Sequence, residues 1–311
     1  MGKYKLIINP QSGKGAALEK IPIVEQFLTD AGIDFEVTLT EDIDHARELA
    51  VQACKGDFHA IVAMGGDGTI NEVLNGMMAV KLSSGRIPLL GVLPVGRGND
   101  FVYGVNIPAD LEEACRILLK EETFLMDVGK VTGGDYPRGR FFGNGIGIGF
   151  DTIVGMEAAG FKKVRGALAY ILGAARTLFK FPEPPEMEIS FNSEVISRKP
   201  TQISIMNGKR MGGVFFMAPA SSSQDGVFDM LITEHLSRGD TMKLISMITK
   251  GTGCQHPRVI CRKSETVSIK SPQGRIVCHA DGETICTDGH ELQVECLPAQ
   301  IRIISRPPVT D

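Results

Sequence analysis

Short apolar runs and amphipathic stretches alternate along the first part of the chain. The apolar runs are rich in aliphatic side chains, which predicts buried strands at residues 5–8, 34–40, 58–64 and 89–93. Between them, apolar residues recur at helical spacing, which predicts helices with buried faces at Leu18, Ile21, Val24 and Leu28; Ala46, Leu49 and Ala53; Ile70, Val73, Leu74 and Met77; and Leu111, Ala114, Cys115 and Leu118. Gly32 ends the first helix, and Pro22 is expected to kink or restart it. The alternation predicts a doubly wound, parallel α/β sheet.

The pattern changes near Met126, and short β-rich runs follow one another from Phe141 onward. These runs predict strands at residues 141–151, 187–191, 202–206, 214–217, 228–233, 259–260, 266–269, 275–279, 292–296 and 301–304. Two helices interrupt them, one within residues 153–180 and one that starts at Ser237, where Asp240 completes a pattern similar to a capping box. We therefore expect an α/β domain at residues 1–130 and an all-β sandwich with helical insertions at residues 131–300.

A glycine-rich turn follows the predicted strand at residues 58–64. Gly65, Gly66 and Gly68 are expected to allow positive φ and a close approach of the backbone to a ligand. The helix that follows directs free N–H groups and a positive dipole into the turn, which suits phosphate. Asp67 suggests that Mg²⁺ lies between this carboxylate and the phosphate. The alternative is a structural turn in which Asp67 is the helix N-cap.

Two further polar loops follow predicted strands of the same sheet. With the glycine-rich turn they occupy residues 9–15, 65–69 and 94–100, and all three are rich in Gly, Asn or Ser. Because the carboxyl ends of parallel strands meet at one edge of a sheet, we expect these loops to lie together. The sequence thus predicts a nucleotide cleft at this edge.

Composition narrows the class of protein further. The formal net charge is −4, so no basic field indicates binding to nucleic acid. No uncharged apolar run is long enough to span a bilayer, and the first residues do not form a signal peptide. The seven cysteines include no Cys-x-x-Cys pair, which favours reduced thiols in a cytoplasmic protein over a disulfide framework.

Several motifs in order along the chain resemble those of one family. They are Asn9-Pro-Gln-Ser-Gly13, Gly65-Gly-Asp-Gly-Thr-Ile-Asn-Glu72, Leu93-Pro-Val-Gly-Arg-Gly-Asn-Asp-Phe101, Asn144-Gly-Ile-Gly-Ile-Gly-Phe-Asp151, Gly212-Gly-Val-Phe-Phe-Met-Ala-Pro219 followed by Asp225-Gly226, and Asp281-Gly-Glu283. Together they resemble the diacylglycerol kinase catalytic-domain family, in its branch of soluble bacterial lipid kinases. The glycine-rich turn alone is shared with NAD kinases, so the ordered set carries the resemblance.

The resemblance implies an active site between a nucleotide-binding α/β domain and a β-sandwich domain, with residues 301–311 returning to the first domain. It implies ATP as phosphate donor and a lipid primary hydroxyl as acceptor. Glu283 would be the base, with Asp281 beside it and Asp67 at the metal and phosphate. The implied nucleotide contacts are Asn9, Pro10, Gln11, Ser12, Gly13, Thr40, Gly65, Gly66, Asp67, Gly68, Thr69, Ile70, Asn71, Gly96, Arg97 and Asn99. A second Mg²⁺ would bind Asp225 and the carbonyl groups of Ser222 and Val227.

Two of these motifs leave alternatives open. The family usually has Thr or Ser where this chain has Arg97, which could bind phosphate bidentately and alter the choice of donor. The residues Asp281-Gly282 also read as a simple hairpin turn. If the two carboxylates of Asp281 and Glu283 face one side of a strand, one pKa would rise; if Gly282 makes a turn, they splay.

A basic and apolar segment at residues 161–181 could rest on an anionic membrane beside the lipid substrate. The alternative is an ordinary amphipathic helix packed on the sandwich. We therefore expect an ATP- and Mg²⁺-dependent lipid kinase, with diacylglycerol as first candidate, in the cytoplasm or peripheral at the inner membrane face. The alternatives are an NAD kinase and a non-catalytic nucleotide- or lipid-binding regulator. The sequence names neither the lipid head group nor the oligomeric state.

Overall fold

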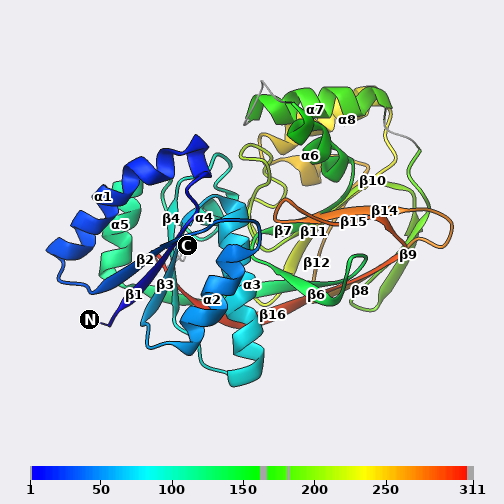
Figure 1. Cartoon of the computed structure of the whole chain (residues 1–311). Coiled ribbons are helices and arrows are strands. Elements are labelled where there is room, and N and C mark those ends of the chain that lie inside the picture. The colour runs from blue at the N-terminus through cyan, green and yellow to red at the C-terminus, as the bar shows by residue number, and fades with distance from the viewer. Residues whose placement is uncertain (1, 162–166, 181–182, 307–311) are drawn as a thin grey trace. The chain divides into compact units, whose positions relative to one another are not determined.

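The computed structural model describes residues 2–161, 167–180 and 183–306 of the chain (Figure 1). The chain folds into two compact units. One unit consists of Met1–Asp127 together with Ala299–Asp311, and the other consists of Val128–Pro298. Each unit has its own sheet architecture.

The first unit is a parallel α/β fold. Its strands are β1 (Tyr4–Ile8), β2 (Phe35–Leu39), β3 (Ala60–Gly65), β4 (Leu89–Pro94) and the end of β16 (Glu291–Ile304), in the order β2-β1-β3-β4-β16. The registers of β1, β2, β3 and β4 are parallel, and Ile303 of β16 pairs in parallel with Leu90. The helices are η1 (Ser12–Lys14), α1 (Ala16–Asp30), α2 (His45–Lys55), α3 (Asp67–Ser84), α4 (Asp100–Gly104) and α5 (Leu111–Lys120). Figure 1 shows α1 and α5 on one face of this sheet and α2 and α3 on the other, which confirms the doubly wound prediction.

Burial explains why the sequence of this unit predicts its strands so directly. Every residue of β1 and β3 is buried, so both strands read as continuous apolar runs. β2 lies at the edge of the sheet and is only partly buried. In α1 the buried residues are Ala17, Val24 and Leu28, whereas Leu18 is 47% exposed, so the predicted buried face was wrong at that position. The helix also continues through Pro22 instead of restarting there.

The second unit is an antiparallel β-sandwich with helical insertions, as predicted. Its strands are β5 (Thr123–Gly133), β6 (Tyr136–Phe142), β7 (Gly145–Gly149), β8 (Met187–Phe191), β9 (Glu194–Arg198), β10 (Pro200–Met206), β11 (Phe228–Glu234), β12 (Val259–Ser264), β13 (Thr266–Lys270), β14 (Ile276–Ala280), β15 (Glu283–Gly289) and the first part of β16. One sheet has the order β12-β11-β10-β7-β14-β15, and the other has β16-β13-β8-β9, with β5 pairing with β16 and β6. Aliphatic side chains of both sheets form one core between them, among them Ile148, Ile203, Ile269 and Leu292.

Three helices and a 3₁₀ turn are inserted between these strands. They are α6 (Phe150–Gly160), α7 (Ala167–Lys180), α8 (Arg238–Ile248) and η2 (Gly253–Gln255). α6 packs on β7, β10 and β14, and α7 packs on α6 and α8. Ser237 is the N-cap of α8 and accepts the N–H of Asp240, which confirms the predicted start of that helix. No helix in the described ranges is long and apolar enough to cross a bilayer.

Several predicted boundaries in the second unit were wrong. The run at residues 141–151 is not one strand: it divides into β6 and β7 at Gly143-Asn144, and α6 begins at Phe150. α6 directly follows the glycines of residues 143–149, and two helices, α6 and α7, lie where one helix was predicted within residues 153–180. Residues 214–217 contain only an isolated bridge between Met211 and Phe215. β5, β9 and β15 were not predicted, and the two runs at 292–296 and 301–304 belong to the single strand β16.

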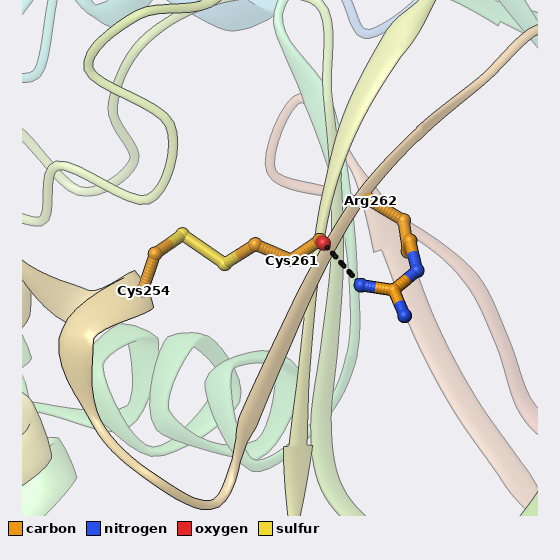
Figure 2. The surroundings of a disulfide bond; sticks show 3 residues. All are labelled: Cys254, Cys261 and Arg262. Atoms are coloured by element: carbon orange, nitrogen blue, oxygen red, sulfur yellow. Dashed lines mark hydrogen bonds between the residues drawn. A yellow bond between two sulfur atoms is a disulfide. The ribbon is translucent and has the colours of Figure 1, made fainter.

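Figure 2 shows a disulfide bond between Cys254 of η2 and Cys261 of β12. The prediction that all cysteines are reduced was therefore wrong for this pair. The turn between η2 and β12 brings their Cα atoms to 5.9 Å, although the two residues are seven positions apart in the sequence. The other five cysteines are free thiols, at Cys54, Cys115, Cys278, Cys286 and Cys296. Burial raises the pKa of the Cys54 thiol to about 11, which makes it unreactive.

Replacement of both Cys254 and Cys261 by Ser should lower the stability of the second unit. A disulfide that closes a loop this short contributes about 2 kcal/mol by restricting the unfolded chain. We expect a lower unfolding midpoint in denaturant for the double variant, and the same shift when the natural chain is treated with a reductant. The double variant itself should not respond to the reductant. Equal midpoints for the oxidised natural chain and the variant would contradict the prediction.

Candidate active site

Three loops at the carboxyl edge of the first unit are joined by hydrogen bonds. Nδ2 of Asn9 donates to Oγ1 of Thr69 at 3.2 Å, which connects the loop after β1 with the turn after β3. The N–H of Val95 donates to the carbonyl of Gly65 at 2.8 Å, which connects that turn with the loop after β4. Asn9 Oδ1 also accepts the N–H of Gln11 at 2.9 Å and so fixes its own loop. The structure thus brings the three glycine-rich loops together.

The glycines of these loops are needed because two backbone segments approach each other closely, and less because of unusual backbone angles. Gly66 has φ −95°, and neither it nor Gly65 or Gly68 has positive φ, so the predicted positive φ at these residues was wrong. A Cβ at Gly96 would lie 2.6 Å from the Cα of Gly66, and a Cβ at Gly65 would lie 2.5 Å from Oγ1 of Thr69. The turn after β3 and the loop after β4 can therefore touch only because glycines form both surfaces.

Gly13 differs from these glycines because both its backbone angle and its surroundings require glycine. Its φ is +62°, which favours a residue without a Cβ. A Cβ there would also lie 2.8 Å from the carbonyl oxygen of Val95. The neighbouring Lys14 is exposed and has φ +66°. Ser12 and Gly13 form the short η1 turn, whose backbone leads into α1.

Asp67 connects the helix it begins to the loop after β4. The N-cap of α3 is Gly66, so the alternative in which Asp67 caps its own helix does not hold. Instead, Oδ1 of Asp67 accepts the N–H of Phe101 at 3.0 Å, in the first turn of α4. The side chain of Asn99, the N-cap of α4, makes no capping hydrogen bond, so Asp67 takes that role from another loop. Burial raises the pKa of Asp67, and the backbone N–H groups of Phe101, Asn99 and Asp100 act against that rise.

A second carboxylate lies beside Asp67. A Cβ at Gly98 would lie 3.1 Å from Oδ2 of Asp67 and 3.4 Å from Oδ2 of Asp100, so both oxygens border the space that the glycine leaves open. Asp100 is buried, and sequence reasoning had quoted it in a motif without giving it a role. Because Mg²⁺ usually binds through one or two carboxylates and completes its shell with phosphate and water, Asp67 and Asp100 are the candidate ligands in this part of the site.

The other residues predicted to contact the nucleotide divide into buried and exposed groups. Ile70 and Asn71 are each 1% exposed, so they pack inside the unit, and Asn71 accepts a hydrogen bond from Asn75. Thr40 is also buried, and its N–H donates to the carbonyl of Ile8 at the end of β1. Arg97 is exposed, and it makes no hydrogen bond or ion pair with any residue in the described ranges.

In the second unit, Asp281 and Gly282 form the turn between β14 and β15. Their φ values are +49° and +87°, which is the pattern of a type I′ hairpin turn, and Ala280 pairs with Glu283 across it. The hairpin alternative of the sequence analysis therefore describes the backbone correctly. Since Gly282 makes a turn, Asp281 and Glu283 splay instead of sharing one face of a strand.

The carboxylate of Asp281 is fully used by the backbone. Its oxygens accept the N–H groups of Gly143 at 2.7 Å and of Asn144 and Gly145 at 2.9 Å each. The N–H of Asp281 donates in turn to the carbonyl of Gly145 at 2.9 Å. Glu283 is partly exposed, and its side chain makes no hydrogen bond or ion pair with any residue that the structure describes. Asp281 thus anchors the turn, while the carboxylate of Glu283 is available to a ligand.

The turn predicted to hold a second Mg²⁺ already contains a cation. Nζ of Lys263 lies 2.8 Å from Oδ2 of Asp225 and 3.1 Å from Oδ2 of Asp229. Lys263 and Asp229 are direct partners in the register of β11 and β12. Burial acts to lower the pKa of Lys263, but its contacts with Asp225 and Asp229 raise it above the ordinary value.

The remaining oxygen of Asp225 and its neighbours offer little to a divalent ion. Oδ1 of Asp225 accepts the N–H of Val227 at 3.4 Å, and Ser222 Oγ accepts the N–H of Gln224. With the ammonium group of Lys263 between the two carboxylates, this donor set does not fit a divalent ion. The second Mg²⁺ at Ser222, Asp225 and Val227 stays a prediction.

Replacement of Asp281 by Ala should destabilise the second unit. Three backbone N–H groups would lose their acceptor, and because the site is partly open to water we expect a loss of about 2 kcal/mol in the free energy of unfolding. The matched control is Asp288→Ala, which removes an exposed carboxylate from the same hairpin. Denaturant unfolding of the two variants provides the comparison. An Asp281→Ala chain as stable as Asp288→Ala would contradict the anchoring role.

If Lys263 keeps a divalent ion out of this turn, replacement of Lys263 by Met should allow Mg²⁺ to bind there. The variant leaves Asp225 and Asp229 without a counter-ion, so MgCl₂ without nucleotide should raise its thermal midpoint; stabilisation at ten times the dissociation constant is about 1.4 kcal/mol. Adding Asp225→Asn should abolish that rise, and Lys270→Met, another exposed strand lysine, should not produce it. If Asp225→Asn alone removed a Mg²⁺ response from the natural chain, the metal would bind despite Lys263.

Comparison with known proteins places this arrangement in a family. Residues 3–131 match the model of the diacylglycerol kinase catalytic domain, and residues 144–305 match that of the YegS C-terminal NAD kinase beta sandwich-like domain. The chain is 28% identical over 285 residues to a diacylglycerol kinase of Bacillus subtilis (strain 168), covering 91% of this chain and 90% of the relative. It is 28% identical over 268 residues to a diacylglycerol kinase of Staphylococcus haemolyticus (strain JCSC1435), covering 86% and 78%.

Solved structures share the fold of the whole chain. A diacylglycerol kinase from Bacillus anthracis str. Sterne has a TM-score of 0.75 at 20% identity and covers 99% of this chain and 98% of its own. Yeast NADH kinase complexed with NADH has a TM-score of 0.51 at 11% identity, with 98% and 84% covered. The second family model alone spans more than half of the chain, and the two together span nearly all of it. The chain therefore belongs to the diacylglycerol kinase family of bacterial lipid kinases.

Proposed function

We propose that this lipid kinase transfers the γ-phosphate of ATP to the primary hydroxyl of a membrane lipid, with diacylglycerol as the first candidate and phosphatidic acid as its product. The observation that carries the proposal is that the two carboxylates at the hairpin turn differ in their contacts. The carboxylate of Asp281 accepts hydrogen bonds from three backbone N–H groups. The carboxylate of Glu283, two residues later, has no such partner and can contact a ligand. A fixed turn that presents an unpaired carboxylate suits a general base.

The first unit supplies what phosphoryl transfer needs on the side of the donor. The N-terminus of α3 and the glycine loops offer backbone N–H groups, and Lys14 and Arg97 are exposed cations. Asp67 and Asp100 are the residues that would hold Mg²⁺, which neutralises charge on the phosphate oxygens when bound. The nucleotide contacts proposed from the sequence stand here as part of the same proposal, with Ile70 and Asn71 supporting the turn from inside the unit.

The second unit supplies the chemistry at the acceptor. Glu283 takes the proton of the lipid hydroxyl while the hydroxyl oxygen forms a bond to the γ-phosphorus. The bond between that phosphorus and the bridging oxygen breaks, and ADP leaves with the electron pair. We propose that the exposed guanidinium of Arg97 binds phosphate bidentately, in place of the hydroxyl that the family usually has at this position.

We further propose that the helical insertion of the second unit meets the membrane that contains the lipid. Met156 of α6 and Ile171 and Leu172 of α7 are 49%, 52% and 39% exposed, so large apolar side chains of both helices are available for contact with lipid. Lys162, Lys163 and Arg165, the basic residues proposed to attract anionic lipid, lie outside the described residues. Such contact would place the kinase at the cytoplasmic face of a membrane as a peripheral protein.

An NAD kinase is the second candidate, since its turn after the third strand has similar glycines. The likeness to yeast NADH kinase is one of fold alone. Against it, Asn71 and Glu72 directly follow the turn, as in lipid kinases. A non-catalytic regulator, the third alternative, would not need a free carboxylate at Glu283 on an anchored turn.

The base is tested by Glu283→Gln, which keeps the shape of the side chain but cannot accept the proton. General-base catalysis contributes about 10²–10⁴-fold, so turnover should fall by that order while the affinity for ATP stays unchanged. Asp67→Asn should differ by weakening Mg²⁺-dependent nucleotide binding as well. Glu295→Gln, at an exposed position of β16, is the matched control.

The measurement is transfer of label from ATP to a panel of lipids that includes diacylglycerol, phosphatidylglycerol and a sphingoid base, with NAD as a further acceptor. Labelled diacylglycerol supports the proposal as stated, and another labelled lipid corrects the acceptor only. Labelled NAD would favour the second candidate. Near-normal turnover of Glu283→Gln on the best lipid would remove the assignment of the base.

A further inference from the structure

A polar cluster lies between the six-stranded sheet of the second unit and helix α6. His279 of β14 and Asp151 of α6 face each other there, with 3.9 Å between Nε2 and Oδ2, and their side chains are only 16% and 13% exposed. Nε2 of Gln202, on β10, donates to Oδ2 of Asp151 at 3.3 Å, and the N–H of Thr152 donates to Oδ1 at 2.7 Å. The function proposed above uses neither His279 nor Asp151.

The sequence of β7 makes room for this cluster. Ile146 and Ile148 of this strand point into the sandwich core, so Gly147 between them lies on the side toward α6. A Cβ at Gly147 would lie 2.2 Å from Oδ2 of Asp151 and 2.4 Å from Nε2 of His279. Only glycine at this position allows the imidazole and the carboxylate to face each other.

The other ring nitrogen of His279 contacts the hairpin turn. The N–H of Gly282 donates to Nδ1 of His279 at 3.3 Å. Burial lowers the pKa of His279 to about 4, so the ring is neutral at physiological pH. A neutral ring whose Nδ1 accepts must carry its proton on Nε2, and that N–H faces Asp151. This tautomer accepts the N–H of Gly282 at Nδ1 and directs its Nε2–H toward the carboxylate of Asp151, whose Oδ2 lies 3.9 Å from Nε2.

The turn that carries Glu283 is therefore held at two points. Asp281 anchors it to residues 143–145 through its carboxylate and its own N–H. Gly282, the next residue, has His279 as the acceptor of its N–H. Glu283 follows directly, so a change at Gly282 changes the direction of the carboxylate.

We propose that His279 is a positioning residue for Glu283, which it fixes by accepting the N–H of Gly282, and that Asp151 holds His279 in the tautomer that can do so. The inference rests on the proposed role of Glu283 as the base. It assigns a role to two residues that do not themselves touch the substrate.

Two replacements of His279 separate its two nitrogens. His279→Asn places a side-chain oxygen near the position of Nδ1 and can still accept the N–H of Gly282. His279→Gln places its polar group near Nε2 and cannot. We expect His279→Gln to lower kcat about tenfold, because a small displacement of a catalytic group has a large effect on rate. His279→Asn should retain most of kcat, and KM for ATP should stay unchanged in both variants.

Asp151→Asn tests the tautomer. Its amide N–H₂ would oppose the N–H on Nε2 of His279 and favour the tautomer whose Nδ1 is protonated, so kcat should fall as in His279→Gln. In a His279→Asn background no Nε2 remains, and Asp151→Asn should then cause no further loss. All variants are compared as full-length chains with the same lipid and with their thermal midpoints measured.

The outcomes separate this inference from the function on which it rests. If Glu283→Gln keeps near-normal turnover, the proposed base fails. If Glu283→Gln is inactive and His279→Gln has the kcat of the natural chain, only the positioning role is overturned. Equal losses for His279→Asn and His279→Gln, or additive losses with Asp151→Asn, would overturn it as well, since a purely structural role predicts them.

Discussion

Backbone N–H groups that leave water must find an acceptor, and in both units an aspartate from a distant part of the chain provides it. Asp67, at the start of α3, accepts the N–H of Phe101 in the first turn of α4. Asp281, in the β14–β15 turn, accepts three consecutive N–H groups at residues 143–145. A short carboxylate does this well because it is charged and offers several lone pairs. Each aspartate thus fixes two segments relative to each other, and the remaining side chains of those segments are held where they can meet a ligand.

Glycine residues, which have no Cβ, make these close contacts possible. Loops that are joined this tightly leave no space for a Cβ at Gly96, which would meet the Cα of Gly66 at 2.6 Å, or at Gly147, which would meet the carboxylate of Asp151. The glycines that resemble a nucleotide-binding motif therefore do two things. In the first unit they let two loops touch; in the second they let polar groups enter the space between a sheet and a helix. Close approach explains both, whereas positive φ explains only positions such as Gly13.

The sequence predicts a helix or strand well when the apolar pattern of that segment alone identifies it, and poorly when tertiary packing decides its bounds. The parallel strands are buried on both faces and read as continuous apolar runs, so their positions follow from composition alone. The junction at residues 141–151 was missed because the apolar residues of β7 and of the start of α6 form one unbroken β-like run. β9 was missed because it is largely exposed and carries no apolar alternation. Strand propensity does not identify the β7–α6 junction or an exposed strand such as β9, because tertiary packing determines both.

For the candidate site, the sequence predicted which residues take part but not which groups they contact. The motifs identify Asp67, Asp225, Asp281 and Glu283, but not what each of them contacts. The partner of Asp225 is Lys263, which comes near only through the register of β11 and β12, and the partner of Cys254 is set by the turn before β12. A carboxylate oxygen of Asp100 and one of Asp67 lie close to Gly98, which has no side chain to occupy that position. Such contacts depend on long-range pairing, which a single sequence does not state.

The residues Asp281-Gly282-Glu283 show why a turn and a functional site need not be competing interpretations. A type I′ turn needs positive φ at both central residues, and Asp and Gly are among those that accept it most readily. Once the turn is formed, Ala280 must pair with Glu283, and a slip by one residue would reverse the direction of every side chain in β15. The turn therefore determines where the carboxylate of Glu283 points. Because Asp281 can reach back to the N–H groups of residues 143–145 from its left-handed position, the same dipeptide that makes the hairpin also anchors it.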